Sequence, residues 1–300
     1  MDIFRKFLFG EVFKNQILYI SLIFISFTFF LSVASSQVVT NMNTANTSNT
    51  HLNNVNQSTR ITIIDIVDDI DCSNNLHNQV KKDNVTLFIA LGDLCYKSDL
   101  ADFKNTFGVF KNSNKLACVS GNHESEEDGS TKIIKQAREY CGDPWYRKIA
   151  NDTTLLIGLN TNGDIKSQTE LGRSLVTNST MMNGIKNVML LAHKPANAPF
   201  ESYHPPKNST IEMISGIEGN ISKGIQVYEI AAHNHFMAKS SDGRLFISGA
   251  GGRYHHEGTS SLEWPFVNKK DYGYLQIRIN NTDGNVLSTN FYGLYGRLIH

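Results

Sequence analysis

The chain has 300 residues, of which 40% are hydrophobic and 19% are charged, so it is long enough to bury one sizeable core. Its formal net charge at pH 7 is zero, and Lys and Arg form no run outside the extreme N-terminus. Proteins that track nucleic acids usually carry a basic stripe that neutralises phosphates. We therefore predict no nucleic acid partner.

The first predicted element is a membrane-targeting segment. Residues 17–34 contain no charged side chain, and basic residues precede them. This length lies between a long signal-peptide core and a short transmembrane helix, and small residues at its end are typical of a cleavage site. For residues 1–36, a cleaved signal peptide and a membrane anchor both remain open. Either one predicts a protein that is secreted, or held in the cell membrane facing outside.

The next segment, residues 37–59, is rich in Asn, Ser and Thr and contains few large apolar side chains. It cannot bury enough surface to offset the entropy of ordering, so we predict a disordered stalk. Asn-X-Ser/Thr sequons suit an exported glycoprotein, although many sequons arise by chance in an Asn-rich chain. The sequons in this chain begin at Asn46, Asn56, Asn84, Asn151, Asn178, Asn208, Asn220 and Asn280.

From residue 60 onward, short apolar runs rich in β-branched residues alternate with helical patterns. This alternation predicts an α/β fold, which we expect to be a four-layer sandwich of two mixed β-sheets flanked by helices, over residues 60–300. The expected strands are 61–67, 85–93, 115–124, 153–162, 187–195, 225–235, 244–252 and 274–280, and the expected helices are 76–82, 98–111 and about 166–183.

Polar side chains of the kinds that bind metals follow five of these strands. Open α/β sheets bind ligands beyond the carboxyl ends of their strands, so these side chains should meet at one edge. Carboxylate, amide and imidazole donors suit iron, manganese or zinc. The candidate residues are Asp69, Asp93, Asn122 with His123, His193, and His233 with His235.

The segments 68–71, 92–96, 121–124, 190–193 and 232–235 resemble, in this order, the motifs of the calcineurin-like metallophosphoesterases, and within them the purple acid phosphatase branch. Residues 248–253 resemble the glycine-rich stretch that follows. The resemblance implies two metal ions, iron with zinc, manganese or a second iron. One ion would be held by Asp69, Asp93, Tyr96 and His235, and the other by Asn122, His193 and His233, with Asp93 bridging both.

The same resemblance implies a hydrolase of phosphate monoesters, similar to acid phosphatases, that acts on small phosphorylated substrates. The targeting segment predicts that it acts outside the cytoplasm. Two cations would activate a hydroxide for attack on phosphorus. His123 would contact the phosphate and help the leaving oxygen depart, and Glu124 would orient the His123 imidazole. Tyr96 has an alternative role as an ordinary packing residue.

The first and last motifs depart from the family pattern. Asp68 and Ala232 stand where glycine is usual, and Asp71 stands where His or Gly is usual. The metal ligand of the first motif could therefore be Asp65, Asp68 or Asp71, although Asp69 alone fits the position directly after the strand. Asp71 could be an extra oxygen ligand, a hydrogen-bond acceptor behind the ligands, or a solvated turn residue.

The four cysteines lack the close paired spacing of a structural zinc site. In an oxidising compartment Cys72 and Cys141 are the expected bridge, with Cys95 and Cys118 acting as small buried hydrophobes.

Two sets of alternatives stay open. His204, His255 and His256 could line a substrate pocket, but we expect solvated loop residues. The same site could serve a phosphodiesterase. The departures in the motifs would also suit a non-catalytic envelope protein that binds metal or phosphate. Loops around residues 96–114, 196–224 and 251–268 would select the substrate.

Overall fold

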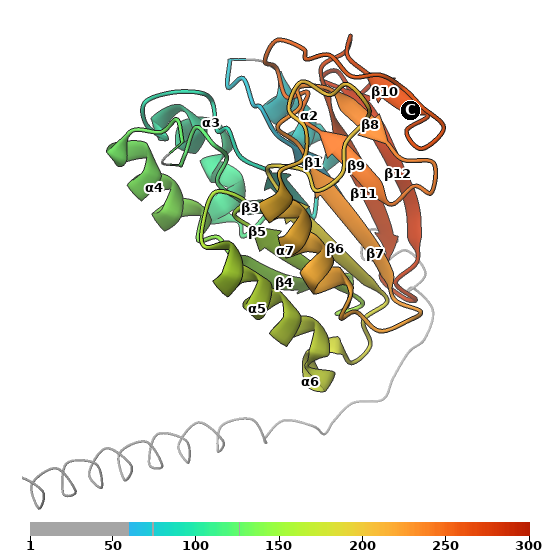
Figure 1. Cartoon of the computed structure of the whole chain (residues 1–300). Helices are drawn as coiled ribbons and strands as arrows, with labels where there is room; N and C mark the ends of the chain where they lie inside the picture. Colours follow the sequence, from blue (N-terminus) through green and yellow to red (C-terminus); the bar gives the residue numbers. More distant parts are fainter. Residues whose placement is uncertain (1–59, 74, 126) are drawn as a thin grey trace, which may run out of the picture. The chain divides into compact units, whose positions relative to one another are not determined.

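The computed structural model describes residues 60–300 except 74 and 126, so the targeting segment and stalk predicted for residues 1–59 lie outside the described residues. Two β-sheets lie at its centre (Figure 1). The first has five strands, in the spatial order β12 (Val286–Gly293), β11 (Gly273–Asn280), β1 (Ile61–Val67), β2 (Leu87–Ala90) and β3 (Leu116–Cys118). Strands β1, β2 and β3 are parallel, and β11 is antiparallel to both of its neighbours.

The second sheet has seven strands. In spatial order they are β10 (Phe266–Asn268), β8 (Met237–Lys239), β9 (Leu245–Ser248), β7 (Gln226–Ala231), β6 (Asn187–Ala192), β5 (Thr154–Leu159) and β4 (Trp145–Ile149). The four strands from β9 to β5 are parallel, and antiparallel strands close both edges.

Helices cover the outer face of each sheet. The first sheet carries α2 (Leu76–Asp83), α3 (Ala101–Asn112) and α4 (Thr131–Cys141), and the second carries α5 (Ile165–Thr177), α6 (Ser179–Met182) and α7 (Asn208–Glu218) (Figure 1). Because side chains alternate along a strand, Ile89 of β2 enters the core between the sheets, whereas its neighbour Phe88 packs under the helices. In β6, Leu191 and Leu190 divide in the same way. The predicted four-layer α/β sandwich is confirmed.

The helices differ from the prediction in two ways. The helix expected at 166–183 is interrupted at Asn178, whose side chain accepts a hydrogen bond of 2.9 Å from the Met181 amide and caps α6. Helices α4 and α7 were not predicted. Within the described part of the chain, no helix is long and apolar enough to cross a bilayer.

The parallel strands of both sheets end near one another, and backbone hydrogen bonds join the two edges. The Asp68 amide after β1 donates to the Ser248 carbonyl at the end of β9 (2.9 Å), and the Asp68 carbonyl accepts from the Gly251 amide (3.0 Å). The loops that follow the two sets of strands therefore form one continuous edge.

Candidate metal centre

The first group of donor atoms comes from three loops. Asp69 follows β1 and is fully buried, and Tyr96 donates its hydroxyl proton to the Asp69 carboxylate. The His235 Nε2 atom lies 3.0 Å from Asp69 Oδ1 and 3.1 Å from the Tyr96 hydroxyl. Burial opposes ionisation of Asp69, but hydrogen bonds from His235 and Tyr96, together with the charges of His235 and His193, outweigh it and lower the Asp69 pKa. A carboxylate, a phenol and an imidazole thus converge on one point.

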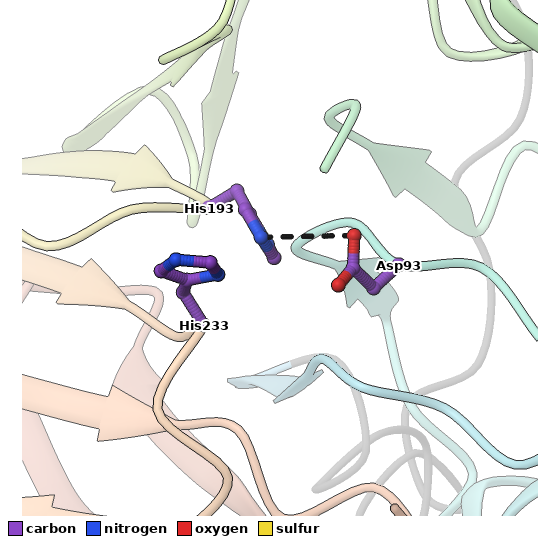
Figure 2. Close-up of side chains that lie close together, drawn as sticks. All are labelled: Asp93, His193 and His233. Carbon is purple, nitrogen blue, oxygen red and sulfur yellow. Dashed lines mark ion pairs between the residues drawn. The ribbon is translucent and has the colours of Figure 1, made fainter. Parts of the chain in front are cut away.

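A second group lies beside the first. Asp93, His193 and His233 are buried, and each offers one atom to a set whose members lie within 4.8 Å of one another (Figure 2). The His193 Nε2 atom is 3.6 Å from Asp93 Oδ1 and 2.7 Å from Asn122 Oδ1. Burial, followed by the charge of His193, lowers the pKa of His233, so His233 stays neutral. Neutral imidazole is the form that binds a metal.

Asp93 belongs to the second group and interacts electrostatically with Asp69 and Tyr96 of the first. Burial raises the pKa of Asp93, the charge of His193 opposes that rise, and the nearby Asp69 carboxylate adds to it. Two carboxylates this close repel one another unless a cation lies between them. The bridging role of Asp93 remains a prediction.

The residues present fit a metal centre by a further observation. Asp68 Oδ1 and Asp69 Oδ2 are buried and have no hydrogen-bond partner among the described residues. A buried carboxylate oxygen without a partner is costly, and a cation would satisfy it. The surrounding donors are oxygen and imidazole nitrogen, the set that suits iron, manganese or zinc.

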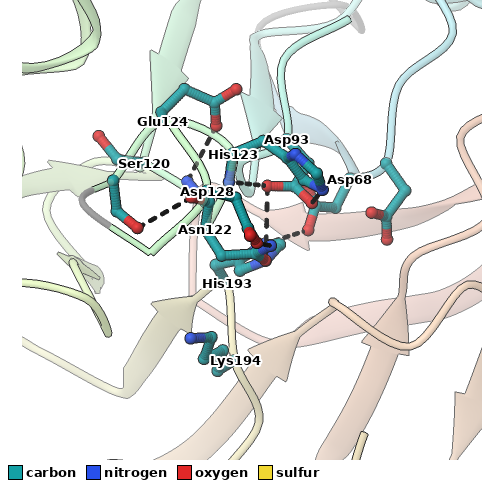
Figure 3. A network of polar contacts seen from close by, with 12 residues as sticks. Asp68, Asp93, Ser120, Asn122, His123, Glu124, Asp128, His193 and Lys194 are labelled. Atoms are coloured by element: carbon teal, nitrogen blue, oxygen red, sulfur yellow. Dashed lines mark hydrogen bonds and ion pairs between the residues drawn. The ribbon is translucent and has the colours of Figure 1, made fainter. Parts of the chain in front are cut away.

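A hydrogen-bonded chain orients the ligands of the second group (Figure 3). Asp68 Oδ2 lies 2.5 Å from His193 Nδ1, and Asp128 accepts a hydrogen bond of 2.7 Å from the Asn122 side-chain amide. Burial disfavours the imidazolium of His193, but the carboxylates of Asp68 and Asp93 outweigh it and raise the His193 pKa to about 10. The predicted ligands did not include Asp128, and Asp68 was only an alternative to Asp69 as the ligand of the first motif.

Sequence comparison decides the family. The profile of the calcineurin-like phosphoesterases matches residues 46–235. The chain belongs to the calcineurin-like phosphoesterase family. Membership, together with the group of Asp93, His193 and His233, supports a dinuclear metal site and a metal-dependent phosphoester hydrolase. No curated protein matches the sequence.

Solved structures share the phosphoesterase fold. The purple acid phosphatase PPD1 from yellow lupin (Lupinus luteus) seeds is 13% identical with a TM-score of 0.55, and the match covers 80% of this chain and 52% of that chain. GAP50, the anchor in the inner membrane complex of Plasmodium, is 12% identical with a TM-score of 0.59, and the match covers 80% of this chain and 87% of that chain. The chain therefore spans about half the length of the lupin phosphatase. At these identities the likeness is one of fold.

The two residues predicted to assist catalysis differ in their contacts. The His123 imidazole is 40% exposed, and its Nε2 lies 3.8 Å from Asp93 Oδ2, so it stands at the mouth of the centre. Glu124 is buried, and its carboxylate accepts hydrogen bonds from the amides of Leu94 (2.8 Å) and Gly121 (3.0 Å). These bonds tie the two ligand loops together, instead of the expected contact with the His123 imidazole.

The three loop histidines were expected to be solvated, and for two of them this was wrong. The His204 ring stacks on His233 with centroids 4.0 Å apart, and the His256 ring stacks on His235 at 3.6 Å. His256 is only 4% exposed. The third, His255, stacks on Tyr272 in the loop before β11, apart from the other two histidine stacks. The stacks form only after the fold joins loops distant in sequence.

Several side chains surround the mouth of the centre. Tyr203 and Tyr254 are each 64% exposed, and their rings lie 4.5 Å and 5.3 Å from that of His256. The Arg253 guanidinium lies 4.0 Å from the centroid of the Tyr96 ring. Arg253 Nε is buried without a hydrogen-bond partner in the described structure. The loops around 196–224 and 251–268 thus contribute side chains beside the centre.

Asp71 is accounted for by a local turn. Its Oδ1 atom accepts hydrogen bonds from the Ser73 amide (2.9 Å) and the Ser73 hydroxyl (2.7 Å). Among the roles left open, these contacts favour that of a turn residue.

The predicted cysteine pairing was wrong. Cys72 pairs with Cys95, and Cys118 pairs with Cys141, with Cα atoms 5.2 Å and 4.9 Å apart. The first bridge joins the loop after β1 to the loop after β2, which carry Asp69 and Tyr96. The buried positions of Cys95 and Cys118 are compatible with bridges because their partners lie on the loop or helix packed beside them.

Proposed function

We propose that this chain is a hydrolase of phosphate monoesters that acts outside the cytoplasm. The observation that carries the proposal is the convergence of the predicted ligand side chains from both sheets on one buried point. These residues are Asp69, Asp93, Tyr96, Asn122, His193, His233 and His235.

The ligands divide into two sets. Asp69, Tyr96 and His235 would hold one cation, the second group around His193 would hold the other, and Asp93 would contact both. When bound, two such cations acidify water and stabilise the charge that develops on the phosphoryl group. A phenol among the donors favours iron(III) for the first position, with zinc, manganese or iron in the second.

The protein's own side chains would complete the reaction. His123 lies at the exposed edge of the centre, where its imidazole can donate a proton to the leaving oxygen. Glu124 would act by bracing the loops that carry Asp93 and Asn122. Arg253 offers a guanidinium that lies over the Tyr96 ring and whose Nε has no hydrogen-bond partner among the described residues.

The location proposed is supported by the two disulfides, because such bridges persist mainly in oxidising compartments. The uncharged segment 17–34 supports export in the same way, either as a cleaved signal peptide or as a membrane anchor.

Two alternatives use the same fold. A phosphodiesterase would need the same cations, and the turn role of Asp71 in place of a histidine favours monoesters. A non-catalytic protein that binds metal or phosphate is the other, and GAP50 shares the fold and is named as an anchor. Against it stands the retention of both donor groups together with His123, which binding alone would not require.

The test combines elemental analysis with hydrolysis of p-nitrophenyl phosphate and bis(p-nitrophenyl) phosphate by the purified chain. We expect two metals per chain and turnover mainly of the monoester. Asp93→Asn should abolish activity, because it removes the shared carboxylate, whereas the exposed control Asp283→Asn should not. Bound metal without turnover of either ester would favour the binding protein, and absence of metal would overturn the proposal.

A further inference from the structure

We infer that Asp68 is a positioning residue that holds His193 in place and strengthens binding of the second cation. The inference rests on the proposed metal centre. Asp68 stands beside the predicted ligand Asp69, but its carboxylate points to a different part of the centre, toward His193 (Figure 3).

The contact between Asp68 and His193 joins the two sheets. Asp68 follows β1 and His193 follows β6, 125 positions further along the chain. Oδ2 of Asp68 lies 2.5 Å from Nδ1 of His193, and neither side chain is exposed to solvent. Hydrogen bonds from the Asp68 amide to Ser248 and from the Gly251 amide to the Asp68 carbonyl fix the backbone on both sides. Asp68 is therefore held rigidly.

This contact determines which nitrogen of His193 faces the centre. With Nδ1 held by the carboxylate, Nε2 points at Asn122 Oδ1 and toward Asp93. A carboxylate behind a ligating histidine fixes the orientation of the ring and makes it a stronger donor.

Orientation alone would not require an acid at this position. The Leu91 carbonyl lies 3.2 Å from the same Nδ1 atom and could accept its hydrogen bond. Asp68 adds a carboxyl group in a place without solvent, and its Oδ1 atom has no partner among the described residues. A buried carboxylate is costly unless positive charge lies close to it, and the second cation would supply that charge.

The Asp68 carboxylate would make up for the lack of an acid in the second donor set. The first set contains the acid Asp69, whereas the side chains particular to the second set, those of Asn122, His193 and His233, include no acid. With the second cation bound, Asp68 would place a carboxylate directly behind this set, so its removal should weaken binding of the second cation selectively.

The experiment measures Zn²⁺ binding to the full chain by titration against a competing chelator, with metal content checked by elemental analysis. Asp68→Asn keeps the size of the side chain and removes its charge. We expect the first dissociation constant to stay within about twofold and the second to rise roughly 10- to 100-fold. Asp68→Gly, in which the Leu91 carbonyl remains, should show the same selective loss and replaces Asp68→Asn if that variant fails to fold.

Asp65→Asn is the matched control. Asp65 is also an unexposed acid of the β1 segment, but its side chain is bonded to Gln276 on the first sheet. The Asp65→Asn variant should bind both cations with the same dissociation constants as the wild type. An unchanged second constant in both Asp68 variants, or equal weakening of both cations, would overturn the inference. A wild-type chain that binds fewer than two cations would overturn the proposed centre as well, so the two failures can be told apart.

Discussion

Several residues of the proposed metal centre have backbone conformations that most residues avoid. Asp69, Asp93, Tyr96 and His233 have φ values of 53°, 44°, 52° and 65°. Such conformations cost on the order of 1–3 kcal/mol each and persist where surrounding structure imposes them. Gly92 (φ 119°) shows that constraint, because an added Cβ would lie 2.6 Å from the Gly121 backbone. The loops are thus held close enough to bring the ligands together.

His123 offers a test of the proton donor. His123→Ala should lower kcat for an alkyl phosphate roughly 100- to 10,000-fold, because its poor leaving group needs a proton, and should affect p-nitrophenyl phosphate much less. Metal content should not change, since His123 is not a proposed ligand. Steady-state kinetics on both esters measure the effect.

The control for this variant is His255→Ala, because His255 stacks on Tyr272 outside the donor groups. Similar losses of kcat in the two variants, or equal losses on both esters, would contradict a proton-donor role for His123.

Among the strands, the position of each functional residue follows from parallel pairing. Strands β1, β2 and β3 deliver ligands from one sheet, and β6 and β7 deliver them from the other, always just beyond their carboxyl ends. Strands β2 and β6 are buried along their whole length. Strand β7 contains a buried acid, Glu229, which is only 8% exposed and accepts a hydrogen bond from the Ala196 amide (2.7 Å).

Glu229 should make the fold less stable at high pH. Burial raises its pKa from 4.5 to about 7, and the hydrogen bond from Ala196 offsets only part of that rise. The folded chain therefore holds a proton that the unfolded chain releases near pH 4.5, so stability is lost as pH rises through 7. At about 1.4 kcal/mol per pKa unit, the loss approaches about 3 kcal/mol.

Glu229→Gln keeps the acceptor and cannot ionise. Thermal melting of the metal-free chain should show the variant more stable than the wild type at pH 8 and equal to it at pH 4. A stability difference that does not change with pH would show that Glu229 ionises normally.

At the level of the complete fold, packing of the two sheets creates the centre, and the disulfides reinforce its surroundings. Each bridge spans 23 positions in sequence. In the chain-entropy account, closing loops of this length contributes about 3 kcal/mol each. Only the Cys72–Cys95 bridge links the loops that carry Asp69 and Tyr96.

Removal of either bridge by paired Cys→Ser substitution should therefore lower stability by about 3 kcal/mol, or roughly 6–12 °C in Tm. The pair Cys72→Ser and Cys95→Ser should also weaken Zn²⁺ binding, whereas Cys118→Ser with Cys141→Ser should weaken it much less. Because the sequence separations are equal, each variant controls for the other. Equal metal affinities in the two variants would show that the first bridge does not support the ligand loops.

Local pattern was sufficient to predict the α/β sandwich and to place Asp93 and His193 directly after buried strands, because strand periodicity and the residues that end a strand are properties of short segments. The family resemblance supplied the division of the ligands. Partners distant in the chain could not be obtained in this way. The contact of Asp68 with His193, the stacking of His256 on His235 and the pairing of the cysteines all depend on how the two sheets and their loops pack, since the residues that meet are far apart in sequence.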